Sequence, residues 1–416
     1  LYGAAGAFKQ IRYLIYGSLF YFVVAVILDL RRYRYIKQHV HVPGEVEAKD
    51  DPDVAAEREK IEAHGRGGCA HLCAHYLRKV YGYGMGAKVA VKSLSFEAHQ
   101  GECFSLLGPN GAGKTSTMLM LSGEVKPDGG QGILGGFSVY KDILRVFPIL
   151  GICPQSDTLW ETLTAREHLE LGCALRGISQ SESRGVVSQL LNDLVLEEWA
   201  DKTVQTFSGG NKRKLAVAMS LIGSPSIVLL DEPSTGMDPI SKKKMWELIR
   251  SERRGRVLLL TTHSMAEAEA LSTRIGIMRG GELRCIGSAQ HLKSRFGRGL
   301  HLQIKAPGGQ LQDLKSLLNE VLGGKAAVHQ TGSGEELGGD LFQFHIQRLE
   351  GGKGTEGVGE EGTLYPLPLA ALFQALESNK ERLQIHNYCI SQASLEQVFL
   401  SISGEDQDSE PLNPQP

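Results

Sequence analysis

The sequence predicts a mixed α/β protein with three parts: one membrane-spanning helix, a large α/β domain and a small α+β domain. Residues 13–28 are apolar and carry no charge. Between residues 76 and 296, short apolar strands alternate with helical segments, a pattern typical of a mostly parallel, doubly wound sheet. After residue 300 the alternation changes to that of a smaller domain of split-βαβ type.

The first part is predicted to be a transmembrane helix with a basic juxtamembrane segment, over residues 1–37. The apolar run is slightly short for a span, but Ile11 and the flanking Lys9, Arg12 and Arg31 extend it. Four basic residues follow the run and two precede it, which puts its C-terminal side in the cytoplasm. A signal peptide or a buried core helix fits these flanks less well. Since the chain begins with Leu1, we expect it to be a fragment.

The second part comprises a linker and the large domain. Residues 38–75 are polar, contain a short helical run at 54–63, and are predicted to be a cytoplasmic linker. Residues 76–296 form the large domain. Strands are expected, among others, at 89–96, 103–107 and 227–230, and a helix at 114–122.

The third part covers residues 300–403. Strands are expected at 300–305, 326–330, 341–347 and 383–391, and helices at 311–322, 367–379 and 395–402. The Gly/Glu-rich run 351–362 and the acidic, Pro-rich tail 404–416 are expected to be disordered.

Composition excludes some classes of protein. The formal net charge of −2 does not suit a nucleic-acid-binding domain, which is usually strongly basic. Seven cysteines without framework spacing indicate a reducing, cytosolic-side environment.

The clearest motif is a phosphate-binding loop of the form G-x-x-x-x-G-K-[ST], which follows an apolar strand and opens a helix. Backbone N–H groups of such a loop surround a phosphate chain, helped by the helix dipole. Lys114 would reach the β- and γ-phosphates, and Thr115 would ligate Mg²⁺. The predicted nucleotide-binding residues here are Gly108, Pro109, Asn110, Gly111, Ala112, Gly113, Lys114, Thr115 and Ser116.

A pair of carboxylates ends the apolar run at 227–230, at the strand end where open α/β sheets bind ligands. Asp231 would hold Mg²⁺, and Glu232 would act as the general base on the attacking water. Between this pair and the loop lies Ser208-Gly209-Gly210, which precedes an apolar helix. A helix cap alone would explain Ser208, because the phosphate loop already holds the nucleotide of the same domain.

Together, these motifs resemble the ABC transporter ATPases, specifically subfamily A. The resemblance rests on GPNGAGKT (108–115), SGGNKRK (208–214) and LLDEPSTGMD (229–238), with Gln155 in CPQ and His263 in TTHS. SGGNKRK, TTHSMAEAEAL and SLEQVFL resemble the second, C-terminal nucleotide-binding domain of that subfamily. The resemblance is dense over 76–296 and moderate from there to residue 403. For the leading helix it consists only of its position in the chain. It implies a P-loop NTPase fold of the ABC type with a helical subdomain, followed by a regulatory domain.

The resemblance also implies roles for individual residues. Gln155 would contact Mg²⁺ and the attacking water, and His263 would contact the γ-phosphate. Tyr81 would stack on adenine, with Tyr83 as the alternative. The residues implied to complete the nucleotide site of an opposite domain are Ser208, Gly209, Gly210 and Asp238.

The implied partners are a second nucleotide-binding domain and the coupling helices of a transmembrane domain, contacted by residues 157–166. Because each domain completes the other's site, the chain alone should be nearly inactive. The implied location is a multi-pass membrane protein with a cytoplasmic ATPase domain, and the implied cargo is lipid, exported or flipped. A soluble ABC-type ATPase acting on DNA or ribosomes and a non-hydrolytic ATP-dependent switch are the alternatives. The near-neutral charge argues against the first, and the presence of both Glu232 and His263 argues against the second.

Overall fold

The computed structural model describes residues 51–64, 71–82, 87–156, 158–296, 300–307, 310–322, 326–332, 341–348, 369–392 and 394–404. The predicted membrane span, the run 351–362 and residues 405–416 lie outside these ranges. Across the ranges that are described, no helix has both the length and the hydropathy needed to cross a bilayer.

A six-stranded sheet forms the centre of the large domain, with the order β10-β9-β3-β8-β7-β6. Pairing is parallel from β9 to β6, and only β10 runs antiparallel to its neighbour. Alternate residues of each buried strand face opposite layers: Val228 and Leu230 pack with the helices, whereas Ile227 and Leu229 pack on the other side. The strands are β3 (Cys103–Leu107), β6 (Leu150–Cys153), β7 (Ile227–Asp231), β8 (Val257–Thr262), β9 (Arg274–Arg279) and β10 (Glu282–Gly287).

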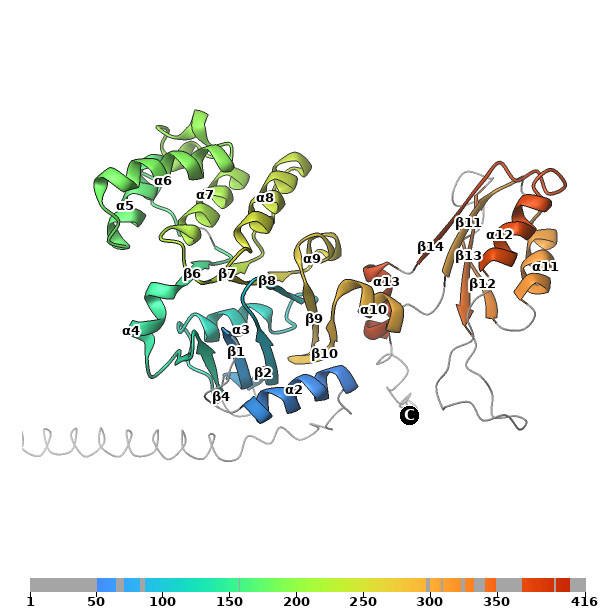
Figure 1. The fold of residues 1–416 in the computed structure, drawn as a ribbon, viewed down its shortest axis with the longest axis horizontal. Helices are drawn as coiled ribbons and strands as arrows, with labels where there is room; N and C mark the ends of the chain where they lie inside the picture. The colour runs from blue at the N-terminus through green and yellow to red at the C-terminus, as the bar shows by residue number, and fades with distance from the viewer. Residues whose placement is uncertain are drawn as a thin grey trace, which may run out of the picture.

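The layer above the sheet in Figure 1 is helical and provides the predicted helical subdomain. Two of its helices begin with capping boxes, formed by Thr164 with Glu167 and by Ser179 with Glu182. Its members are α5 (Ala165–Leu175), α6 (Gln180–Asp193), α7 (Gly209–Leu221) and α8 (Pro239–Glu252). Two further helices, α3 (Lys114–Leu121) and α9 (Met265–Leu271), are the next elements along the chain after β3 and β8.

The layer below is a separate antiparallel sheet of order β2-β1-β4-β5. Its strands are β1 (Leu72–Tyr81), β2 (Lys88–Ala98), β4 (Gly129–Leu134) and β5 (Phe137–Ser138). The run 89–96, expected in the mostly parallel sheet, therefore lies in a different sheet. Apolar strands of either kind look alike in sequence, and the short connection between β1 and β2 allows only antiparallel pairing. The segments α4 (Ile143–Val146) and the 3₁₀ turn η3 (Phe147–Ile149) connect β5 to β6.

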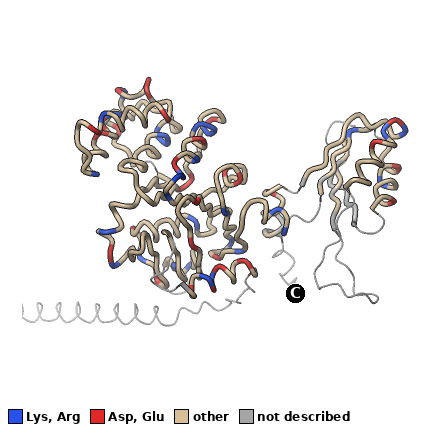
Figure 2. The backbone as a smooth tube through the Cα atoms, in the orientation of Figure 1, with Lys and Arg blue, Asp and Glu red and all other residues tan. Residues whose placement is uncertain are grey.

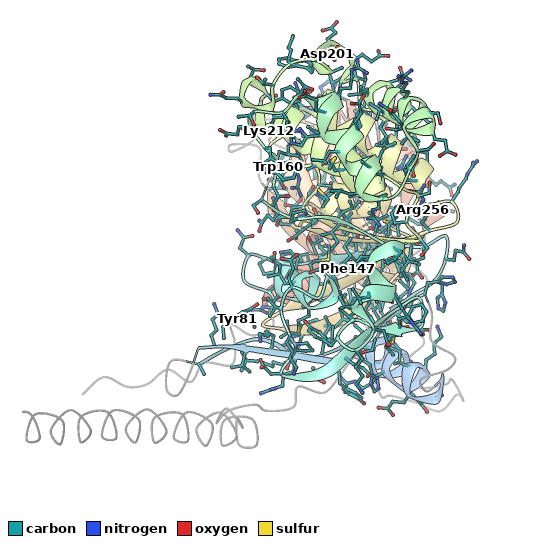
Figure 3. All side chains as sticks on the ribbon, turned by 90° about the vertical axis from the view of Figure 1, so that its left-hand side faces the viewer. Tyr81, Phe147, Trp160, Asp201, Lys212 and Arg256 are labelled. Atoms are coloured by element: carbon teal, nitrogen blue, oxygen red, sulfur yellow. The ribbon has the colours of Figure 1, made fainter. Side chains whose placement is uncertain are left out.

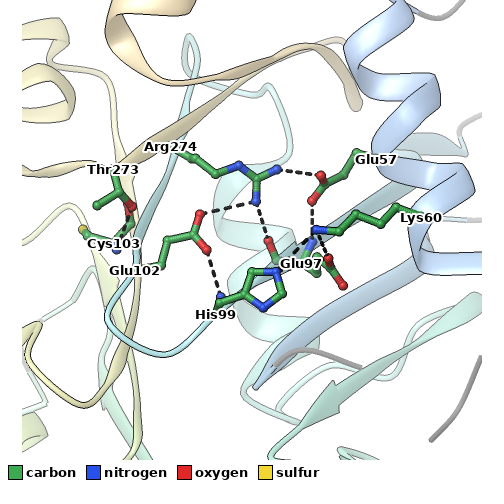
Figure 4. A network of polar contacts seen from close by, with 8 residues as sticks. All are labelled: Glu57, Lys60, Glu97, His99, Glu102, Cys103, Thr273 and Arg274. Carbon is green, nitrogen blue, oxygen red and sulfur yellow. Dashed lines mark hydrogen bonds and ion pairs between the residues drawn. The ribbon is translucent and has the colours of Figure 1, made fainter. Parts of the chain in front are cut away.

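Helix α2 (Pro52–His64) lies in the range for which the sequence predicts a linker, but it packs against the large domain. Val54 and Ile61 are buried in the core. Arg274 of β9 binds Glu57 of α2 (Nη2–Oε2 2.6 Å) and Glu102 (Nη1–Oε1 3.3 Å), in the network of Figure 4. The same network includes an ion pair between Lys60 and the buried Glu97 and a contact from His99 to Glu97 of 3.2 Å.

A second set of ion pairs holds the beginning of α2. Arg295, near the end of α10 (Ala289–Phe296), pairs with Asp51 at 2.8 Å and also with Asp53. His291 contacts Asp53 at 2.8 Å. Burial opposes ionisation of Asp53, but the hydrogen bond from His291 and the charge of Arg295 outweigh it and lower its pKa. The packed unit thus includes residues 52–64 and begins its first strand at Leu72.

The small domain has the strand order β12-β13-β11-β14, with every neighbouring pair antiparallel. The two strands of the unit β11-α11-β12 lie on either side of β13, and the two strands of the unit β13-α12-β14 lie on either side of β11. This is the predicted split-βαβ arrangement. The strand β14 starts four residues later than expected, because residues up to Gln384 form a turn in which Gln384 has a φ of +50°. Its elements are β11 (Leu300–Lys305), α11 (Leu311–Leu322), β12 (Ala326–Gly332), β13 (Leu341–Arg348), α12 (Leu369–Ser378) and β14 (Asn387–Gln392).

The last helix, α13 (Leu395–Gly404), returns to the large domain and packs beside α10 (Figure 1). Leu395 and Val398 share a core with Leu292 and with Leu107, the residue before the phosphate loop. Arg279 donates a hydrogen bond to the carbonyl of Ile402 at 3.1 Å. The small domain is therefore attached to the large domain through helices at both of its ends.

Candidate nucleotide site

The loop between β3 and α3 is shaped by two glycines that tolerate no side chain. A Cβ at Gly108 would lie 2.5 Å from the Met278 carbonyl oxygen, and one at Gly113 would lie 2.4 Å from that of Ala90. Gly113 also has a φ of +104° and forms the N-terminal boundary of α3. Pro109, Asn110 and Gly111 are exposed, so the loop presents its backbone to solvent at the start of a helix.

Lys114 is buried, with 4% of its surface exposed. Its ammonium donates to the carbonyls of Gly108 (2.7 Å) and Pro109 (3.0 Å), which are part of the loop itself. Burial lowers the pKa of Lys114, and the nearby carboxylates of Glu232 and Asp231 oppose this shift. The negative charge of a polyanion bound in the loop would offset the free-energy cost of burying the Lys114 ammonium.

Asp231, the last residue of β7, is buried and accepts hydrogen bonds from the hydroxyl groups of Thr261 and Thr115. Burial raises the pKa of Asp231, and the charge of Glu232 adds to the effect, while both hydroxyls oppose it. The structure thus brings together two of the three predicted Mg²⁺ ligands, Asp231 from β7 and Thr115 from the first turn of α3. Ser116, the next residue, is half-buried.

Glu232 is the point where the predicted catalytic residues meet. Its carboxylate lies 3.3 Å from Gln155 Nε2 and 3.3 Å from His263 Nδ1, and Thr235 Oγ1 is 3.4 Å away. Gln155 and His263 follow β6 and β8, the two strands that flank β7. Because parallel strands end at the same edge of the sheet, three residues far apart in sequence converge there.

The backbone of Glu232 is unusual. It has a φ of +51°, a left-handed conformation that is rare for a residue with a side chain. Its N–H donates to the carbonyl and the hydroxyl of Thr261, at 3.1 and 3.2 Å. Strained backbone of this kind persists only where the surroundings fix it, and it is enriched at functional sites.

The Ser-Gly-Gly segment lies at the N-terminus of α7, at the surface. The Ser208 hydroxyl accepts from the Asn211 N–H (3.3 Å), while Ser208 and Gly209 are exposed. Asp238 likewise caps α8, accepting from Ile240 and Ser241 at 3.0 Å each, and these hydrogen bonds lower its pKa. In a single copy of the chain, both residues act as helix caps.

Tyr81 ends β1 and is 40% exposed; Figure 3 shows it at the edge of the domain. Tyr81 pairs with Lys88 of β2. Two residues further along β2 is Ala90, whose carbonyl oxygen lies against Gly113 and leaves no room there for a Cβ. The side chain thus lies on the β-strands that support the phosphate loop. Tyr83, the alternative, is outside the described residues.

These residues fit a nucleoside triphosphate with Mg²⁺. The loop combines close-packed glycines, a helix terminus and a buried ammonium, which together suit a phosphate chain. Thr115 and Asp231 offer a hydroxyl and a carboxylate oxygen, ligands that suit Mg²⁺ beside phosphate oxygens.

Comparison with known proteins agrees with this geometry. The profile described as "ABC transporter" matches residues 91–235, the stretch from β2 to the residues just after β7. The chain contains an ABC transporter domain. The chain is also 38% identical over 405 residues to Phospholipid-transporting ATPase ABCA3 of Homo sapiens, covering 95% of this chain and 22% of that protein.

The similarity extends beyond the ABC transporter domain. Retinal-specific phospholipid-transporting ATPase ABCA4 of Homo sapiens is 37% identical over 410 residues, or 98% of this chain and 17% of that protein. ABC transporter A family member 8 of Arabidopsis thaliana is 37% identical and is covered to 37% of its length. The chain therefore spans well under half the length of these relatives, and it is homologous to ABC transporters of subfamily A over most of its own length.

A solved structure described as an ATP-binding subunit of an ABC transporter superposes with a TM-score of 0.50. It is 27% identical, and the alignment covers 55% of this chain and 94% of that chain. The fold of the ABC transporter domain is therefore the predicted P-loop NTPase fold of the ABC type.

Two contributors to the site were not identified from sequence. Thr261 binds both Asp231 and Glu232, and Arg213 donates to the carbonyls of Pro154, Gln155 and Asp231. Both stand inside quoted motifs, TTHS and SGGNKRK, but a threonine in a strand and an arginine in a helix have no distinguishing spacing. Only the folded structure brings them to the carboxylates.

Proposed function

We propose that this chain binds and hydrolyses ATP, with Mg²⁺, as the ATPase part of a membrane ABC transporter. The observation that carries the proposal is the convergence of Gln155 and His263 on Glu232 beside a P-loop. Phosphoryl transfer to water requires a positioned nucleophile and neutralised charge more than covalent chemistry, and these residue types supply both.

The roles of the residues follow from their places. Lys114 and the loop N–H groups would hold the phosphates, and Thr115 with Asp231 would hold Mg²⁺, which neutralises charge on the phosphate oxygens when bound. Glu232 would accept a proton from water, with Gln155 orienting that water. His263, whose side chain is about half exposed, would donate to the terminal phosphate.

A second nucleotide-binding domain would complete the site. Ser208, Gly209 and Asp238 are exposed, so N–H groups at the start of α7 are available to a ligand on a facing molecule. This supports an ATP sandwich between two domains, with hydrolysis followed by separation.

The segment after Gln155 would contact the membrane domain. Trp160 in this segment is 57% exposed, and its backbone N–H is held by the buried His168 at 3.0 Å. Lys212 of α7 lies 3.7 Å from Glu161, and Figure 3 shows Lys212 and Trp160 along the same edge. An exposed aromatic that is fixed next to the Ser-Gly-Gly helix suits a surface that transmits closure of the dimer.

The proposed cargo is lipid, exported or flipped, since two of the similar proteins are named phospholipid-transporting ATPases. The proposed setting is a multi-pass membrane protein whose ATPase domain faces the cytoplasm, with residues 1–37 as its last transmembrane helix and residues 300–403 as a regulatory domain.

The test is Glu232→Gln in the intact transporter that contains this chain. We expect ATP binding to persist while hydrolysis at this site falls by about 10²–10⁴-fold, because the amide cannot accept the proton. Glu247→Gln, an exposed carboxylate on α8, is the matched control and should hydrolyse ATP at the wild-type rate. Binding of ATP without any hydrolysis in the wild type would instead favour the non-hydrolytic switch. Wild-type hydrolysis by Glu232→Gln at both sites would refute the assignment of the base.

A further inference from the structure

Arg213 lies one turn inside α7, the helix that begins after Ser208, and only 4% of its surface is exposed. Its guanidinium donates to three backbone carbonyls. Nη1 binds the carbonyls of Pro154 and Gln155, the latter at 3.2 Å, and Nη2 binds the carbonyl of Asp231. One side chain therefore joins the ends of β6 and β7 to the helical layer.

This arrangement depends on the shape of the guanidinium. Arginine presents several N–H donors in a rigid plane, so it can bind acceptors on two strands at once. Lysine has a single donor atom and cannot replace all of these contacts. Carbonyls that end buried strands need a donor, and losing one leaves an unsatisfied polar group.

The three carbonyls belong to the segments that carry the reacting groups. Gln155 is itself bound through its backbone, and Asp231 immediately precedes Glu232. The 3.3 Å contact between the Gln155 amide and the Glu232 carboxylate thus rests on two backbones that Arg213 holds together. The backbone of Glu232 has a left-handed φ of +51°. The residue is held through its carboxylate by the contact with Gln155 and through its N–H by the hydrogen bonds to Thr261.

We propose that Arg213 is a positioning residue for hydrolysis, which aligns Gln155 with Glu232 and makes that alignment depend on the position of α7. The inference rests on the proposed ATPase function. Arg213 is five residues from Ser208 along one helix, an axial distance of about 7.5 Å at 1.5 Å per residue. A nucleotide of a facing domain that contacts the start of α7 would therefore act on the Gln155–Glu232 pair through about one and a half turns of one helix.

The matched control is Arg176, which has the same chemistry at the other end of β6. Its guanidinium donates to the carbonyls of Phe147 (2.9 Å), Pro148 (3.4 Å) and Leu150 (2.6 Å). Arg176 therefore also ties the helical layer to β6, but at the strand start and away from Glu232. Arg176 is exposed whereas Arg213 is buried, so the two variants are compared by kcat as well as by melting temperature. A purely structural role at either position would lower the melting temperature without a selective loss of kcat.

The experiment compares Arg213→Lys, Arg213→Met and Arg176→Met in the intact transporter, by kcat, KM for ATP and melting temperature. We expect both Arg213 variants to lose about 10–100-fold in kcat while KM changes less than about threefold, since small misplacements of catalytic groups are costly. Arg176→Met should keep kcat. Should Arg213→Met be too unstable to assay, Arg213→Lys keeps the charge and the stem and gives the same readout.

Two results would overturn the inference: wild-type kcat in Arg213→Lys, or a loss of kcat in Arg176→Met as large as in the Arg213 variants. Glu232→Gln, measured alongside, separates this failure from that of the proposed function. If Glu232→Gln is inactive and Arg213→Lys is fully active, only the role of Arg213 is wrong. If Glu232→Gln hydrolyses ATP normally, the proposed chemistry of the site is wrong.

Discussion

Asp231 and Glu232 are neighbours in sequence but have different surroundings. Asp231 is enclosed at the end of β7 and accepts two threonine hydroxyls, whereas Glu232 faces Gln155 and His263 on flanking strands. Both are buried, so their proposed division of labour, metal ligand and base, is reflected in their different hydrogen-bond partners. The sequence predicted which residues these are, because a motif with a fixed spacing surrounds them.

Asp231→Asn should stabilise the metal-free protein while reducing its activity. The raised pKa of Asp231 means that the folded protein binds this proton more readily than the unfolded chain does. Stability therefore falls as pH rises from the ordinary carboxyl pKa through the raised one, and the full cost is present above it. Asparagine removes that cost and still accepts a hydrogen bond from Thr261.

The measurement is melting temperature in a chelator between about pH 4 and about pH 7.5. The variant should melt higher than the wild type at the alkaline end, and the difference should shrink at the acidic end. With Mg²⁺, hydrolysis should fall by about 10²–10³-fold, as for loss of one charge-stabilising group. A variant that melts lower than the wild type at the alkaline end contradicts this account.

At the scale of elements, the strands and helices were mostly predictable, but their partners were not. The bounds of β3, β11 and α11 equal the predicted ranges, because a buried strand and an amphipathic helix have distinct periodicities. The antiparallel sheet and the attachment of α2 depend on contacts across long sequence separations. A short, charged helix gives no sign of its partner, and Arg274, which binds Glu57, lies far along the chain.

Arg274→Met should destabilise the domain by about 3 kcal/mol, because it leaves the buried Glu57 and Glu102 without their cation. Denaturant unfolding of the purified transporter's ATPase core, read by a probe on α2, measures it. Arg166→Met is the control, since Arg166 pairs with the exposed Asp201 at 2.7 Å and such pairs contribute little. Equal loss in both variants would show that the network does not hold α2.

At the scale of the whole molecule, the charges are mixed and the small domain is bound at both ends. Figure 2 shows Lys and Arg interspersed with Asp and Glu on both domains, as the net charge of −2 suggests. The chain leaves the large domain after α10 and returns as α13, whose Leu395 and Val398 belong to the same buried cluster as Leu107. The small domain has a core of its own, but α13, which lies within the predicted range 300–403, packs in a core of the large domain.

Two deletions in the intact transporter should differ for this reason. Removing residues 300–394 and joining α10 to α13 by a flexible linker should keep the ATPase fold but change the rate of hydrolysis or its coupling to transport. Removing residues 300–416 should also lower the melting temperature, because the apolar surface beneath α13 becomes exposed. Unchanged turnover and transport in the first deletion would show that the small domain is not regulatory.

The sequence by itself determined the phosphate loop, the carboxylate pair and the alternation of elements, since each depends on residues close together in the chain. Tertiary structure alone decided which groups meet: Gln155 and His263 at Glu232, Arg213 at the carbonyl of Asp231, Arg274 at α2, and α13 in the cluster that includes Leu107. Local periodicity follows from the geometry of the backbone. The choice among buried partners follows from packing and from satisfying buried polar groups, and these are properties of the folded chain.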